Sequence, residues 1–214
     1  ICLFSLNRPE VVVELVSLIT TEPPADLDEK QRFLYPNVAC EILTSDMPSL
    51  KQRMVEDPAI MNKLFSFFEQ TSELNPLLAS FICKTFGTLI IKKMEQDWFL
   101  YQTICLHVLE FIKSKDNFLE CMVRHFSTPV IMDLLLTMLN EVEDAKMKSN
   151  FLEWINEMGL IERMIDVLRV PTESEKHIIV AQFLIEVIKT GRCNRQNDTE
   201  DRKGLPNPLL QRME

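Results

Sequence analysis

The sequence predicts an all-α protein, built as an irregular armadillo- or HEAT-like solenoid of helical repeats. Three observations predict this fold. Glycine is scarce, at 4 residues in 214, against about 7% in average usage, and barrels, sandwiches and glycine-rich phosphate loops need it for turns with positive φ. Apolar residues recur at helical spacing along most of the chain. Prolines stand where helices would begin, at positions that need no amide donor.

The helices follow in order from these start and stop signals. We expect them near residues 9–20, 27–44, 48–56, 58–70, 76–93, 95–113, 116–126, 128–141, 144–158, 160–169 and 173–190, with the second bent or interrupted at Pro36. Asp57, Asn75 and Thr128 each precede a proline, so each can cap the helix that follows. The clearest apolar face is that of 128–141, made of Ile131, Leu134, Leu135, Met138, Leu139 and Val142.

A stacked arrangement is favoured by helices that are apolar almost all round. The extreme case is 173–190, where apolar residues run from Ile178 to Ile188 with few interruptions, so we expect neighbours to cover it on both sides. Short connections at Asp57 and Gly159 make consecutive helices antiparallel neighbours. A row of about ten such helices is most simply a solenoid. The alternative is a compact bundle, because no repeat of fixed period is visible.

The domain organisation predicted is one helical domain over residues 1–190, a flexible polar linker over 191–205 and the start of a further helix over 206–214. The linker is rich in Asn, Gln, Asp and Glu and nearly free of apolar residues. Leu209 and Leu210 then resume an apolar pattern. Because the chain ends inside this predicted helix, we expect it to be a piece of a longer protein.

Composition and charge exclude several classes. The chain is 46% hydrophobic and 26% charged, which is ordinary for a globular protein, and its formal net charge is −9. A phosphate backbone or an anionic lipid surface would be repelled by most of the surface. The longest apolar stretch, 77–91, is interrupted by Lys84 and is shorter than the ~20 residues that span a bilayer. We therefore expect no nucleic-acid partner and no membrane insertion.

The six cysteines point to a reducing compartment. None forms a C-x-x-C pair, and Cys40, Cys83, Cys105 and Cys121 lie inside apolar helical runs, as buried free thiols do. Cys2 and Cys193 complete the set. The prediction is a cytoplasmic protein that can also be nuclear.

Residues for catalysis, metals or cofactors are few. Only three histidines exist, none with the spacing of a helical metal site. His107 and Glu110 share a helix face, and Cys121 and His125 are four residues apart, but neither pair has the third group that a site requires. The four glycines are scattered singly, so no phosphate loop is present. We predict no enzyme activity and no cofactor.

Two further features are given structural interpretations. The acidic cluster Glu141, Glu143 and Asp144 is interpreted as a solvated turn at a helix start. Trp154 and Tyr35 are amphipathic anchors that we expect in the core more than at a contact surface. A helical stack without a catalytic cluster is typical of a protein-binding surface.

Several strings resemble the SAPS domain, the helical repeat domain of the regulatory subunits of protein phosphatase 6. They are Glu22-Pro23-Pro24, Asp28-Glu29-Lys30 with Arg32, Tyr35-Pro36-Asn37, Cys40 to Asp46, Leu74 to Phe81, Ser114-Lys115-Asp116, Ile131 to Leu136, Trp154, Asn156-Glu157, Leu160-Ile161 with Arg163, and Asn207 to Leu210. Their order and approximate spacing are those of the family from about Glu10 to Met213.

Two segments depart from the family pattern. Asp97 to His107 are eleven residues that the family does not suggest, and because eleven residues are close to three helical turns they can extend a helix without rotating its apolar face. An outward bulge is the alternative. Ser127-Thr128-Pro129 replaces an expected Gly-Thr-Ser-like turn and is an acceptable helix start.

The resemblance implies a non-catalytic scaffold that binds the catalytic subunit of phosphatase 6, helps to choose its substrates and works with ankyrin-repeat proteins. The alternative is a helical-repeat adaptor for other protein cargo that leaves the phosphatase unbound. Polar side chains inside the resembling strings are the candidate partner-binding residues. They are Glu29, Lys30, Arg32, Asn75, Asp133, Asn156 and Glu157.

Overall fold

The computed structural model confirms the all-α prediction. It describes residues 8–26, 28–171, 174–201 and 208–209, and of Glu29, Ser174 and 193–201 the backbone only. The helices are α2 (Pro9–Thr20), α3 (Glu29–Arg32), α4 (Leu34–Leu43), α5 (Pro48–Glu56), α6 (Pro58–Ser66), α7 (Pro76–Ile90), α8 (Trp98–Lys113), α9 (Phe118–Arg124), α10 (Pro129–Asn140), α11 (Ala145–Glu157), α12 (Leu160–Arg169) and α13 (Ser174–Asp201). No described residue lies in a β-strand.

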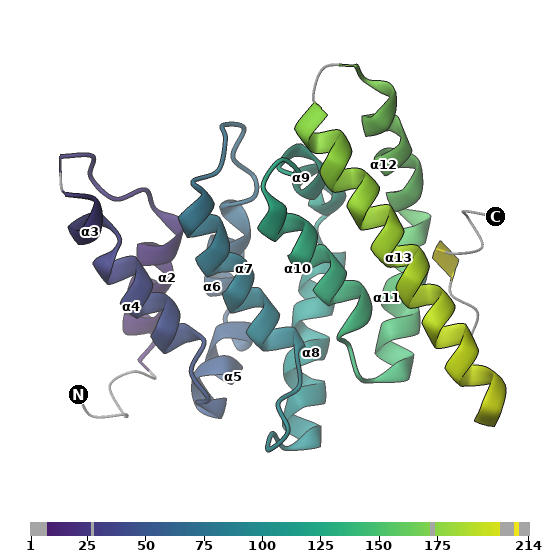
Figure 1. Cartoon of the computed structure of the whole chain (residues 1–214). Coiled ribbons are helices and arrows are strands. Elements are labelled where there is room, and N and C mark those ends of the chain that lie inside the picture. Colours follow the sequence, from purple (N-terminus) through teal and green to yellow (C-terminus); the bar gives the residue numbers. More distant parts are fainter. Residues whose placement is uncertain (1–7, 27, 172–173, 202–207, 210–214) are drawn as a thin grey trace. The chain divides into compact units, whose positions relative to one another are not determined.

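The chain divides into two compact units, Ile1–Ser114 and Lys115–Glu214. In the first unit α4 and α7 lie side by side, with α2 and α6 in a layer behind them (Figure 1). Helix α2 contacts α4, α5, α6 and α7, and α8 packs on α5 and α7. This two-layer stacking is the packing predicted for helical repeats.

The second unit is layered in the same way. Helices α10 and α13 lie side by side, and α11 and α12 are behind them (Figure 1). Consecutive helices pack as antiparallel neighbours, α10 on α11, α11 on α12 and α12 on α13. The helical-repeat architecture is therefore present within each unit. Its assignment to the armadillo or HEAT type stays a prediction, as does the domain boundary at residue 190.

Side-chain caps mark the starts of α6 and α7, as predicted. Asp57 accepts a hydrogen bond from the Ala59 N–H at 2.9 Å, and Asn75 Oδ1 accepts from Leu77 and Leu78 at 3.0 and 3.2 Å. Helix α10 begins at Pro129 as predicted, but Thr128 makes no side-chain capping bond, so the role predicted for Thr128 is wrong. The fixed φ of proline is sufficient to start this helix.

Aromatic rings form the centre of each core. In the first unit Phe65 contacts Phe68 edge-on at 6.2 Å between ring centroids, and Phe68 lies 5.8 Å from Phe86. In the second unit Trp154 lies 5.6 Å from Phe151 and 5.9 Å from Phe118. Trp154 is half-buried and packs on two fully buried rings, so it lies at the edge of the core.

The thiol prediction is confirmed for four of the six cysteines. They are buried and form no disulfide bond: Cys40, Cys83, Cys105 and Cys121. Burial raises the pKa of the Cys40 thiol, which keeps it protonated. Cys2 and the side chain of Cys193 lie outside the described residues.

The second predicted helix is interrupted at a different place. The break is at Phe33, with ψ of 2° between α3 and α4, and not at Pro36. Pro36 lies in the first turn of α4, where a missing amide donor costs no intrahelical bond.

The segment Asp97 to His107, expected to depart from the family pattern, is almost entirely helical. Asp97 caps α8 by accepting from the Leu100 N–H at 2.8 Å, and residues 98–107 are part of that helix. The bulge is therefore wrong, whereas the lengthening of a family helix by these residues stays a prediction.

The last helix differs from expectation in length and in burial. It continues to Asp201, so the backbone of 191–201 is helical where a linker was expected; no proline interrupts the chain between Pro171 and Pro206.

The prediction that neighbouring helices cover α13 on both sides is wrong. Val180 and Phe183 are buried, but Ile178 is 59% and Ile185 49% exposed, because α13 packs on α10 and α12 with one face.

No helix among the described residues has the length and apolar character needed to cross a bilayer.

Candidate functional site

The first unit has an apolar surface groove of about 340 Å³, here called the proline groove. Helix α2, the connection that follows it, and the first turns of α3 and α4 form its walls. It is lined by Glu14, Ser17, Leu18, Thr21, Glu22, Pro23, Pro24, Gln31, Arg32, Tyr35 and Pro36. Many of these residues belong to the strings on which the family resemblance rests.

Tyr35 is the exposed large hydrophobic side chain of the groove. It lies in the first turn of α4 and is 68% exposed, so the interpretation of Tyr35 as a core residue is wrong. Pro36 beside it is buried. The apolar spacing of the segment does not reveal this difference, because both residues lie in the first turn of α4 and the helices packed on α4 decide which of the two is covered.

A polar node holds one wall of the groove. Glu22 Oε1 accepts hydrogen bonds from Arg32 Nη2 at 3.2 Å and from Asn75 Nδ2 at 2.9 Å. Arg32 Nη2 also reaches the Pro23 carbonyl at 3.4 Å, whereas Arg32 Nε is buried with no partner. The node ties the connection after α2 to the start of α7, 53 residues further along the chain.

The structure therefore brings two of the candidate residues, Arg32 and Asn75, together through Glu22. Both are bonded internally, so they shape the groove more than they offer free polar groups. Lys30 is exposed next to them on α3. The side chain of Glu29 lies outside the described residues. Glu14, Leu18, Glu22, Pro23 and Pro24 were not selected as sites from the sequence.

The remaining candidates lie in the second unit. Asp133 is exposed near the start of α10, and Asn156 and Glu157 are at the end of α11, the antiparallel neighbour of α10. All three are therefore toward the same end of this helix pair (Figure 1). Glu157 is exposed, while Asn156 Oδ1 is buried without a hydrogen-bond partner among the described residues.

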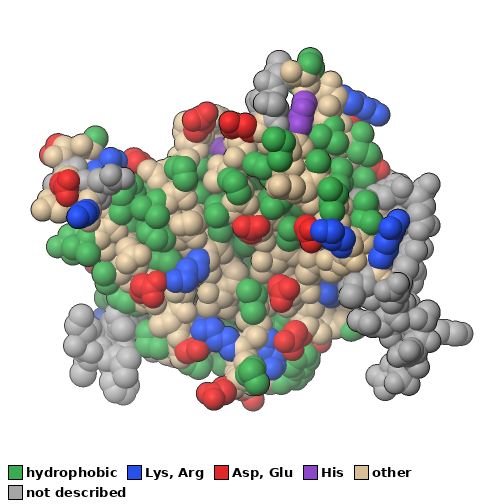
Figure 2. Space-filling model, viewed as in Figure 1, with side chains coloured by type: hydrophobic (Ala, Val, Ile, Leu, Met, Phe, Trp, Pro, Cys, Tyr) green, Lys and Arg blue, Asp and Glu red, His purple; other side chains and the backbone are tan. Residues whose placement is uncertain are grey.

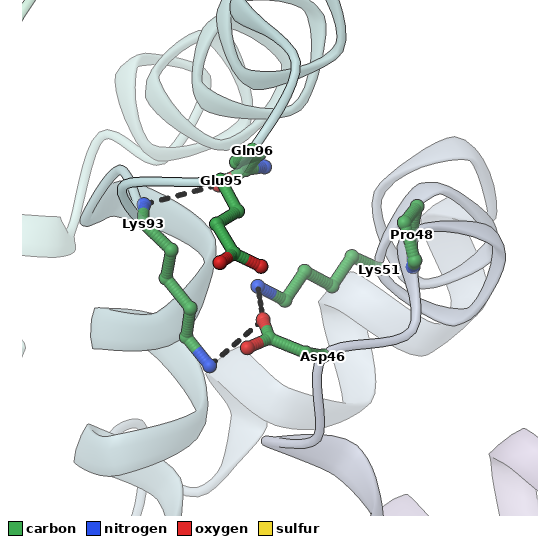
Figure 3. Close-up of a pocket in the computed structure, with 6 residues that line it drawn as sticks. All are labelled: Asp46, Pro48, Lys51, Lys93, Glu95 and Gln96. Carbon is green, nitrogen blue, oxygen red and sulfur yellow. Dashed lines mark hydrogen bonds and ion pairs between the residues drawn. The ribbon is translucent and has the colours of Figure 1, made fainter.

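A second pocket of about 190 Å³ contains a cluster of charges (Figure 3). Asp46 Oδ1 lies 2.8 Å from Lys93 Nζ and 3.5 Å from Lys51 Nζ. The carboxylate of Glu95 turns toward the same space in Figure 3. Two ammonium groups thus face two carboxylates, and the ion pairs join the turn before α5 to the connection between α7 and α8.

Lys51 is the residue of this cluster that sequence reasoning missed. Its side chain is only 3% exposed, and burial, reinforced by Lys93, lowers the pKa of its ammonium group. The bonds from the two lysines lower the pKa of Asp46. The available signal was helical spacing, because Lys51 precedes Met54 and Val55 by three and four residues on the apolar face of α5.

The residues that the sequence offered for catalysis or metal binding lie in helix hydrogen bonds, in a helix cap or in the core. The His107 ring lies with Nδ1 2.9 Å from the Thr103 carbonyl oxygen one turn earlier. Cys121 and His125 are both buried in the second unit. Asp144 caps α11 by accepting from the Met147 N–H at 2.9 Å, which agrees with the interpretation of the acidic cluster as a turn. The described residues include no group of three or more His, Cys, Asp and Glu placed to hold a metal ion.

Charges of the two signs are mixed on the face drawn in Figure 2. Described Lys and Arg side chains are interspersed there with Asp and Glu, and hydrophobic side chains lie between them. Such a surface suits contact with a protein better than contact with a polyanion.

Comparison with known proteins gives a family match. The family model described as SIT4 phosphatase-associated protein, SAPS, matches residues 99–214. The chain is 37% identical over 209 residues to serine/threonine-protein phosphatase 6 regulatory subunit 2 of Homo sapiens, covering 98% of this chain and 20% of that protein. Regulatory subunit 3-B of Xenopus laevis is 37% identical over 212 residues, with 98% and 23% covered.

A more distant relative is extragenic suppressor of kinetochore protein 1 of Schizosaccharomyces pombe, 31% identical over 190 residues, which cover 86% of this chain and 21% of that protein. The chain spans about a fifth of the length of these curated relatives. No solved structure matches it.

Proposed function

This chain belongs to the SAPS family of SIT4 phosphatase-associated proteins, and on that premise we propose that it is part of a non-catalytic regulatory and scaffolding subunit that binds the catalytic subunit of a phosphatase 6 type serine/threonine phosphatase. The observation that carries the proposal is its similarity, along nearly its whole length, to proteins named as regulatory subunits of phosphatase 6. Binding, and not chemistry, is the contribution of the chain.

The geometry supports a docking role. Stacked helices offer a broad surface that can engage a globular partner over ~1,600 Å² without a deep pocket. In the first unit the resembling strings around Glu22, Arg32, Tyr35 and Asn75 converge on one surface. Convergence of segments so distant in sequence is the arrangement that a shared contact surface needs.

We assign contact with the phosphatase to the candidate residues in two groups. Glu29, Lys30 and Arg32 belong to the first unit, with Asn75 as a positioning residue. Asp133, Asn156 and Glu157 belong to the second unit. Ankyrin-repeat proteins are the further component of the proposed assembly, and the cytoplasm or nucleus is its proposed location, a reducing environment for the buried thiols.

Co-purification tests the proposal. The 214-residue chain, and a longer form that continues past Glu214, are each mixed with the catalytic subunit of phosphatase 6 and, as a control, with that of phosphatase 2A. We expect selective capture of the phosphatase 6 subunit. Capture by the longer form alone would retain the function and move the contact surface out of this chain.

Charge reversal locates the contact. Asp133→Lys and Lys30→Glu are each expected to weaken capture by about tenfold or more if they lie in the contact. Lys146→Glu, at another exposed position, is the matched control. If neither form captures the phosphatase while circular dichroism shows folded helical protein, the proposal is wrong, and an adaptor for other cargo becomes the better interpretation.

A further inference from the structure

We propose that the proline groove binds an extended peptide segment of a partner protein, in which an apolar side chain stands next to a Lys or Arg. The inference goes beyond phosphatase binding, because it concerns one groove of the first unit and one class of peptide. It rests on the lining, the backbone chemistry and the charge of the groove.

The lining provides a preformed apolar platform. The groove volume of about 340 Å³ is at the lower end of ligand clefts and suits a few side chains more than a folded domain. Tyr35 of α4 is exposed, and Pro24 of the connection and Leu18 of α2 line the same groove. Prolines and a tyrosine have few torsions to lose, so such a surface binds at a low entropic cost.

The backbone chemistry excludes the addition of a β-strand. The connection after α2 carries Pro23 and Pro24 in succession, and neither residue has an amide donor. The Pro23 carbonyl already accepts a bond from Arg32. Recognition must therefore depend on side-chain contacts, as it does when polyproline II segments dock in aromatic-lined grooves.

The charge of the groove favours a basic residue next to the apolar side chain of the peptide. Among the groove-lining residues, the charged side chains are Glu14, Glu22 and Arg32. Arg32 is paired with Glu22, and Glu14 is exposed with no ion pair to a described residue. The groove therefore has an excess negative charge, on a chain whose net charge is −9. A basic residue next to the apolar side chain complements it.

Fluorescence anisotropy with synthetic peptides tests this inference on the 214-residue chain. The probe is a labelled dodecapeptide made of Pro-Leu-Pro-Arg repeats, which presents proline, leucine and arginine in extended geometry in every register. The matched probe of Pro-Leu-Pro-Glu repeats keeps the apolar groups and reverses the charge. We expect saturable binding of the first probe below about 1 mM, and binding of the second that is at least about tenfold weaker.

Variants assign the binding to the groove. Tyr35→Ala is expected to lower the affinity for the arginine probe by at least about tenfold. Glu14→Gln should lower this affinity by a smaller factor and should make it less dependent on salt concentration between about 50 and 500 mM. Leu34→Ala is the control, because Leu34 is exposed next to Tyr35 and does not line the groove. Circular dichroism verifies that each variant is folded.

Three outcomes would overturn the inference. They are the absence of saturable binding of the arginine probe, equal affinity for both probes, and an affinity of Tyr35→Ala for the arginine probe equal to that of the parent chain. If Tyr35→Ala instead converts a dimer to a monomer in sedimentation and the probe does not bind, the occupant is a second copy of the chain. The test needs no phosphatase, so its failure leaves the proposed function untouched.

Discussion

At the scale of the residue, the buried side chain of Lys51 should have a measurable effect on the free energy of unfolding. Lys51→Met should raise the free energy of unfolding at pH 7 by about 1 kcal/mol, because it removes a desolvated charge. Asp46 keeps Lys93 as a partner at 2.8 Å. Asp46→Asn should act in the opposite direction, since it leaves two neighbouring lysines without their shared carboxylate. Urea denaturation measures both changes.

The pH dependence of stability gives a second readout for Lys51. Its pKa is lower in the folded state than the ordinary lysine value of about 10.4, so the unfolded state binds more protons between these two values. Stability should therefore rise with pH across that window, and the rise should be smaller in Lys51→Met. Lys146→Met, at an exposed lysine, is the control. A destabilised Lys51→Met variant with an unchanged pH profile would contradict this account.

At the scale of the element, two glycines have opposite roles. Gly159 joins α11 to α12 with φ of +75°, which favours glycine, so Gly159→Ala should lower the free energy of unfolding by about 1 kcal/mol. Gly87 lies inside α7, and an added β-carbon there would meet no atom within 4 Å apart from the adjacent backbone of its own helix. Gly87→Ala should raise stability by about 0.5–1 kcal/mol.

The two alanine variants serve as controls for each other, because they add the same methyl group in different backbone conformations. Chemical denaturation followed by circular dichroism measures the pair. A Gly87→Ala variant that is less stable than the parent would indicate that α7 packs more closely than the structure gives.

At the scale of the whole molecule, the buried thiols report on the integrity of both cores. Cys40, Cys83 and Cys105 belong to the first unit and Cys121 to the second. In the native protein these four should react with a thiol reagent such as dithionitrobenzoate only as fast as the protein opens. Denaturant should expose them, with those of one unit released together if the unit unfolds cooperatively.

The number of thiols that react in the fast phase tests this prediction. The native chain should show no more than the two thiols of Cys2 and Cys193 in the fast phase. Fast reaction of more thiols would mean that at least one core is open, which would contradict the burial of these residues. The same measurement after mixing with a partner monitors whether binding stabilises either unit.

Much of the fold was predictable because helix starts are local events. Asp57 and Asn75 cap their helices through bonds that span two or three residues, so a short stretch of sequence contains both partners. Helix ends were harder to predict. Helix α13 continues through a polar segment that contains no proline, and neither its composition nor its single glycine ends it.

The sequence by itself determined the helical class, the family resemblance, the order of the helices and the burial of the core thiols, because these depend on spacing and composition. Only the tertiary structure decided which polar residues meet. Glu22, Arg32 and Asn75 form one node although Glu22 and Asn75 are 53 residues apart, and Lys51 is buried against Asp46 while Tyr35 is exposed. Helical periodicity assigns a side chain to a face of its helix. The neighbouring helices decide whether that face is covered, and they are set by contacts between segments distant in the chain.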